Sequence, residues 1–161
     1  MKGDPKIIAL LNEVLKKELT GINQYFVHAR MCQNWGYDGL AKHARAESID
    51  EMKHADRVIE RILFLEGTPN MAGLDKLMIG STVRDQMKND LGLETAAIAI
   101  LKPGIDACTK AGDHVTRTLL ETILAEEEHH IDWLEAQLHQ IEEMGYENYL
   151  LASVAPKGAE E

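Results

Sequence analysis

Two copies of a Glu-x-x-His motif are the first residues in this chain that could do chemistry. Glu51 and His54 form the first copy, and Glu127 and His130 form the second. Residues three apart on an α-helix share a face, so each copy could offer a carboxylate and an imidazole to a metal ion. A single copy is more often a solvated helix face, but two copies favour a paired metal site.

Each motif is preceded by a glutamate at the same distance. Glu18 lies 33 residues before Glu51, and Glu94 lies 33 residues before Glu127. Glu18 continues an apolar stripe at helical spacing and Glu94 interrupts one, so both are expected in the core. A buried, unpaired carboxylate costs several kcal/mol, so these residues need partners. The repeat predicts two helical hairpins of one design whose charged residues converge.

The converging set has the charge balance of a two-metal site. Four carboxylates match two divalent cations, and the two imidazoles serve as neutral ligands. Oxygen ligands mixed with imidazole favour iron or manganese over a structural zinc site. The set resembles the ligand arrangement of ferritin-like carboxylate proteins. The candidate ligands are Glu18, Glu51, His54, Glu94, Glu127 and His130.

Composition limits the class of protein and its partners. The chain has 161 residues, which fits one domain over 1–161, and strong helix formers dominate it. A net charge of -10 argues against nucleic acid or an anionic membrane as a partner and suits attraction of cations. Cys32 and Cys108 have no C-x-x-C spacing, which fits a reducing compartment. With no leader and no long apolar run, the cytoplasm is the expected location.

The helical pattern predicts an all-α fold with a four-helix bundle over about 5–144, which resembles the ferritin-like fold. Asp4 and Pro5 should start the first helix, which runs to Trp35. The second is expected over about 40–66, the third from a cap at Thr82, and the fourth over about 115–144. The third should continue through Pro103 with a kink. Residues 67–82 are too many for a tight turn and predict a long crossover, and a short fifth helix is expected over about 146–155, packed on other subunits.

Five segments resemble the bacterioferritin family, and the resemblance extends over nearly the whole chain. They are "MKGD", "INQYF", "ESIDEMKHADR", "ERILFLEG" and "EEEHHIDWLE". The resemblance implies a ferroxidase centre made by the six candidate ligands, with Glu51 and Glu127 as bridges. It also implies a 24-mer shell built from two-fold dimers, which oxidises Fe(II) with O2 or peroxide and stores ferric mineral. Tyr25 could supply an electron or simply hydrogen-bond a ligand.

Met52 stands inside the first motif but should point away from it. At about 100° per residue it leaves the bundle core and joins Ile49, Ala55 and Ile59 on a second apolar face. Spacing alone favours a flexible filler at a dimer interface. The resemblance instead implies that Met52 and its two-fold mate are the axial ligands of a haem b held between subunits.

Two other functions remain open at this point. One is a haem-binding scaffold or electron-transfer subunit in a mixed shell with a second subunit type, and the other is a non-mineralising di-iron oxidase. The resemblance also suggests a 2Fe–2S ferredoxin as reductant, although Thr68 replaces a leucine of the family's ferredoxin-docking surface. Ala46 stands where some members have an inner-surface histidine, so an auxiliary iron site is not expected there. Glu66 and Asp132 could line an iron-entry pore or be ordinary solvated charges. The remaining histidines are expected to be surface or core residues: His28, His43, His114, His129 and His139.

Overall fold

The computed structural model describes residues 1–154, and this part of the chain is all-helical. Its elements are α1 (Pro5–Trp35), α2 (Asp38–Phe64), α3 (Val83–Ala111), α4 (His114–Met144) and α5 (Tyr146–Leu151). No strand occurs among these residues, and none of their helices is long and apolar enough to cross a membrane. The predicted four-helix bundle with a short fifth helix is confirmed.

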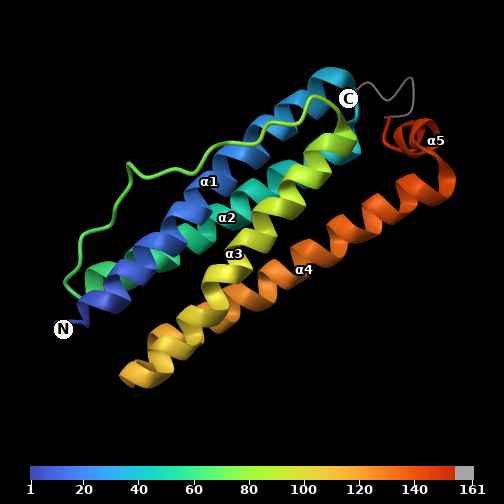
Figure 1. Ribbon diagram of the computed structural model, residues 1–161. Coiled ribbons are helices and arrows are strands. Elements are labelled where there is room, and N and C mark those ends of the chain that lie inside the picture. The colour runs from blue at the N-terminus through green and yellow to red at the C-terminus, as the bar shows by residue number, and fades with distance from the viewer. Residues whose placement is uncertain (155–161) are drawn as a thin grey trace.

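The bundle consists of two helical hairpins joined by a long crossover (Figure 1). α1 pairs with α2 and α3 pairs with α4, while residues 65–82 run along α1 from one end of the bundle to the other. The extended crossover is held by side chains at four-residue spacing on α1. Thr20 accepts a hydrogen bond from the backbone N–H of Asp75, Gln24 from Met78 and His28 from Gly80. These contacts satisfy backbone groups that form no secondary structure.

The predicted helix ends are close to the observed ones. The Asp4 side chain accepts a hydrogen bond from the Lys6 N–H at 2.8 Å, and Thr82 accepts one from the Asp85 N–H at 3.1 Å. α1 ends at Trp35, and Gly36 follows it with a φ of 85°, which favours glycine. α2 begins at Asp38 and ends at Phe64, earlier at both ends than predicted, and α4 begins one residue earlier, at His114.

α3 continues through Pro103, as predicted. Proline lacks an N–H, so the carbonyl of Ala99 loses its helical partner. Both residues are exposed, which lets water take the place of the missing donor. The helix therefore tolerates the proline.

α5 is shorter than predicted. It ends at Leu151 rather than 155, and residue 155 lies outside the described residues. Tyr149 is buried within its own subunit and donates a hydrogen bond to Gln137 on α4 at 2.7 Å. The large buried ring of Tyr149 anchors this helix of six residues. Leu151 stays exposed. The expected packing of α5 on other subunits stays a prediction.

Two apolar clusters flank the middle of the bundle. One includes Leu11, Val58 and Leu120, and the other, toward the opposite end, includes Cys32 and Leu134. The six candidate ligands fall between these clusters along every helix. Tight packing on both sides fixes the backbones that carry them.

Asp113 joins the start of α4 to α2, so we expect Asp113→Ala to destabilise the bundle. Its side chain accepts a hydrogen bond from the Thr116 N–H at 3.0 Å and pairs with Arg61 of α2 at 2.7 Å. The free energy of unfolding should fall by about 1–2 kcal/mol, as for other lost helix caps. Urea denaturation of metal-free protein measures this, with the exposed Asp106→Ala as the matched control.

The effect of Asp113→Ala should depend on pH. Partial burial raises the pKa of Asp113, but hydrogen bonds from Thr116 and the charge of Arg61 outweigh it and lower the pKa overall. The stabilisation is therefore present above the usual aspartate pKa of about 4 and is lost as pH falls below it. If the difference in the free energy of unfolding between wild type and Asp113→Ala grew on acidification, this account would be contradicted.

Candidate metal centre

The structure brings all six candidate ligands together in the middle of the bundle. Each of the four long helices contributes, and none of the six residues is more than 7% exposed. Glu18 comes from α1, Glu51 and His54 from α2, Glu94 from α3, and Glu127 and His130 from α4. The predicted convergence is therefore observed.

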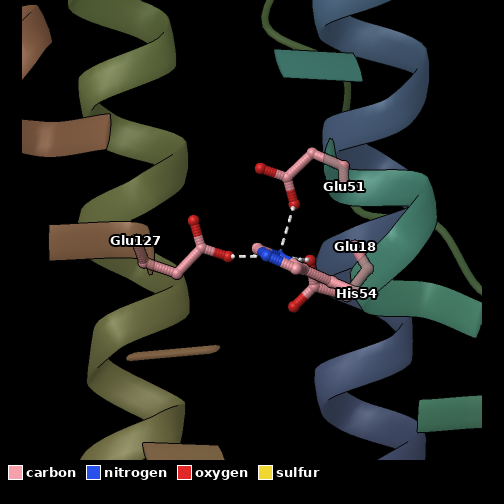
Figure 2. A group of neighbouring side chains, drawn as sticks. All are labelled: Glu18, Glu51, His54 and Glu127. Carbon is pink, nitrogen blue, oxygen red and sulfur yellow. Dashed lines mark hydrogen bonds and ion pairs between the residues drawn. The ribbon is translucent and has the colours of Figure 1, made fainter. Parts of the chain in front are cut away.

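The imidazole of His54 lies among three carboxylates (Figure 2). Its Nδ1 is 3.1 Å from Glu127 Oε1, 3.2 Å from Glu18 Oε2 and 3.6 Å from Glu51 Oε2. These atoms come from three helices, so the position depends on the whole bundle. This group has the mixed oxygen and imidazole ligands of a divalent-cation site.

His130 has a matching environment. Its Nδ1 is 3.0 Å from Glu127 Oε2 and 3.5 Å from both Glu51 Oε1 and Glu94 Oε1. Glu51 and Glu127 thus present one oxygen to each histidine, while Glu18 faces only His54 and Glu94 only His130. The two rings are 6.2 Å apart, centroid to centroid. The arrangement is that of two adjacent metal positions with two shared carboxylates.

Several buried ligand atoms have no hydrogen-bond partner within the described residues. They are Glu18 Oε1, Glu51 Oε1, Glu127 Oε2 and His130 Nδ1. Their close contacts lack the angles of hydrogen bonds. Buried polar atoms are normally paired, because leaving one unpaired costs about 1–3 kcal/mol. Two cations placed between them would satisfy these atoms, so the residues fit a metal pair.

Burial and crowding shift the protonation of the ligands. Burial, reinforced by the charge of Glu51, raises the pKa of Glu18 and Glu94 well above the usual glutamate value. Burial alone would lower the pKa of both histidines, but close contacts with the surrounding carboxylates, Glu127 first, raise it far above normal. Protons therefore balance part of the negative charge when no metal does.

We accordingly expect divalent metal binding to release protons. A metal must displace protons from groups whose pKa is raised, so its affinity should increase as pH rises from about 6 to 8. The melting temperature should also increase with metal concentration. Calorimetric titration with Zn(II) in two buffers of different ionisation enthalpy measures the release. Equal apparent enthalpies in both buffers would contradict it.

Tyr25 contacts this centre directly. Its hydroxyl donates a hydrogen bond to Glu94 Oε1, and the ring is buried. This is one of the two roles expected for the residue from sequence. The hydrogen bond fixes the Glu94 carboxylate toward His130.

Sequence reasoning missed two acidic residues at the outer sides of the histidine rings. Glu126 Oε2 is 2.5 Å from His54 Nε2, and Glu47 Oε2 is 3.1 Å from His130 Nε2. Glu47 also lies 3.4 Å from His43, whose ring stacks on Trp133. Spacing did not single out either residue. Glu47 is one helical turn from Glu51, as many glutamates on solvated helix faces are from one another, and Glu126 adjoins Glu127, although adjacent residues do not share a helix face.

The other histidines lie away from the six-residue centre. His28 is buried beside Asp90 at 2.9 Å, and its Nε2 accepts the crossover hydrogen bond. The remaining three are exposed on α4: His114, His129 and His139. Glu66 and Asp132 are also exposed, and Glu66 pairs with the N-terminal ammonium at 3.1 Å.

Met52 points out of the bundle, as its spacing predicts. It is 55% exposed, between Glu51 and His54 that are almost fully buried. Ile49 and Phe26 are also exposed, which leaves an apolar outer face on α1 and α2. Ala55 is a correction to the predicted face, because it is buried in the core cluster between the helices. A small side chain is suited to such close packing.

Comparison with known proteins agrees with this architecture. The chain matches the ferritin-like domain family over residues 8–144. It is 50% identical to the bacterioferritin of Mycolicibacterium paratuberculosis over 149 residues, which cover 92% of this chain and 94% of that protein. It is 46% identical to the bacterioferritin of Brucella melitensis over 97% of each chain, and 44% identical to that of Rhodobacter capsulatus over both full lengths.

Proposed function

The chain belongs to the bacterioferritin family of iron-storage proteins, and from that premise we propose that each subunit is a ferroxidase that oxidises Fe(II) for storage as ferric mineral. The observation that carries the proposal is the sharing of carboxylates. Glu51 and Glu127 each present one oxygen to His54 and the other to His130. We assign these two residues as bridging ligands, Glu18 and His54 to one iron position, and Glu94 and His130 to the other.

The ligands suit the redox change of the substrate iron. Two Fe(II) ions lose one electron each, and these two electrons, with two protons, reduce O2 to hydrogen peroxide or hydrogen peroxide to two waters. The anionic carboxylates stabilise the Fe(III) product more than Fe(II), because the attraction grows with the charge of the ion. Flanking apolar clusters keep the centre packed, and Tyr25 holds Glu94 in place.

Stopped-flow absorbance after addition of two Fe(II) per subunit, together with the size of the purified protein, tests this proposal. We expect rapid Fe(II) oxidation in a large hollow homo-oligomer, a 24-mer built from two-fold dimers, and a ferric mineral after excess iron. Oxidation no faster than in buffer would contradict the ferroxidase. Fast oxidation in a small oligomer would instead indicate a non-mineralising di-iron oxidase.

We propose further that haem b binds between two subunits and aids iron release. The supporting observation is the exposed thioether of Met52 on an apolar outer face with Ile49 and Phe26. A thioether is a soft ligand that raises the haem potential and favours reduced iron, and two-fold symmetry would supply a second one. Haem binding without ferroxidase activity would favour a scaffold or electron-transfer subunit that works beside a second subunit type.

The reductant and the location follow from the same assignment. We propose a 2Fe–2S ferredoxin as the electron donor to the haem. We place the protein in the cytoplasm, where the two buried free thiols of Cys32 and Cys108 stay reduced.

A further inference from the structure

Glu126 holds the outer side of one imidazole at the metal centre. Its Oε2 is 2.5 Å from His54 Nε2, on the opposite side of the ring from the Nδ1 that faces Glu18 and Glu127. A hydrogen bond from a ring N–H to an ionised carboxylate is of the strong, charge-assisted kind. The His54 ring is therefore held from both sides.

This contact determines which ring nitrogen is free to bind a cation. When metal binds, His54 must be neutral, with one nitrogen carrying a proton and the other a lone pair. Glu126 can only accept at Nε2, so the proton stays there and the lone pair of Nδ1 points to the cluster of carboxylates. Without an acceptor at Nε2 the other tautomer becomes competitive, and it presents an N–H to the metal.

Arg57 fixes Glu126 in this orientation. Its Nη2 is 2.6 Å from the same Oε2 atom, and both side chains are partly exposed at an open hollow of about 760 Å³ between α2 and α4. A solvated pair of this kind contributes little stability by itself. Its effect here is to keep a solvent-accessible carboxylate turned inward, toward a histidine that is 2% exposed.

The corresponding contact at His130 is looser. Glu47 Oε2 lies 3.1 Å from His130 Nε2 but makes no hydrogen bond within the described residues, so it is off the N–H direction. The two histidines therefore differ in their outer support. The stronger restraint is at His54.

We propose that Glu126 is a positioning residue that acts through His54 and supports the metal position shared by Glu18 and His54. The assignment rests on the proposed two-metal centre. Loss of such an outer partner typically lowers metal affinity about 10- to 100-fold. The loss of Glu126 should lower the affinity for the cation at His54 and leave the affinity for the cation at His130 unchanged.

Titration of the full-length protein with Co(II), followed by its visible absorption, tests the proposal without any iron oxidation. Wild-type protein should bind two Co(II) per subunit. Glu126→Ala should weaken one of them about 10- to 100-fold, and Glu126→Gln should recover most of the affinity, because its amide oxygen still accepts the Nε2 proton. Glu128→Ala is the matched control, since it removes the same charge from an exposed residue of α4 that pairs with Lys102 at 3.5 Å.

A double-mutant cycle separates positioning from a general charge effect. In a His54→Ala background, Glu126→Ala should cause no further loss of Co(II) affinity. An equal loss in both backgrounds, or equal weakening of both cations, would overturn the assignment. Wild-type protein that binds only one Co(II) would refute the two-metal centre itself, and the assignment would fall with it. Circular dichroism confirms that each variant is folded.

Discussion

Glu127→Ala should reduce rapid Fe(II) oxidation at least about 100-fold, because loss of a merely supporting residue already costs up to that much. Glu127 Oε1 faces His54 and Oε2 faces His130, so its removal affects both iron positions. The remaining three carboxylates cannot balance two divalent cations. Stopped-flow absorbance with two Fe(II) per subunit measures the rate.

Two further variants separate the causes of this loss. Glu127→Gln keeps the size of the side chain but removes its charge, so it should also be slow. Glu128→Ala changes an exposed neighbour and should oxidise Fe(II) at the wild-type rate. A normal rate in Glu127→Ala would exclude the bridging role and return Glu127 to a buried structural carboxylate.

The six-residue centre could be predicted because buried charge in a helical stripe has few physical explanations. Glu18 and Glu94 occupy core positions by spacing alone, and each precedes a Glu-x-x-His at equal distance. Helix periodicity then places all six residues at the same level of a bundle. Helix periodicity also predicted the apolar residues on both sides of that level.

The outer partners of the histidines could not be predicted from periodicity. Glu126 lies on the partly exposed side of α4, where an acidic residue normally means solvation. It reaches His54 only because α2 and α4 leave a hollow between them, which depends on the packing of all four helices. Glu47 likewise meets His130 across two helices.

The error at Ala55 and the unpredicted contact of α5 also concern packing between elements. Ala55 shares an apolar surface with Ile59 by helical angle, yet the close approach of α1 buries it. In α5, Tyr149 reaches back to Gln137 of its own α4, a contact that spacing in a helix of six residues does not reveal. Angles around one helix predict which residues share a face, but not how near the next helix lies.

The second large effect is expected for haem. Met52→Leu should abolish haem binding, because leucine fills a similar volume but offers no lone pair to iron. The shell should still assemble and oxidise Fe(II), since Glu51 and His54 point into the subunit while residue 52 is 55% exposed. Release of stored iron by an external reductant should slow if the haem carries the electrons.

The matched control for Met52→Leu is Ile49→Leu, which changes an exposed apolar residue of the same outer face without touching a thioether. If Met52 is only a filler at a dimer interface, both variants should have the same small effect on shell assembly and on haem binding. An axial ligand predicts that Ile49→Leu keeps the haem bands of the reduced-minus-oxidised spectrum and Met52→Leu loses them. Unchanged bands in Met52→Leu after haem reconstitution would remove the ligand role, because Met52 is the single methionine of α2.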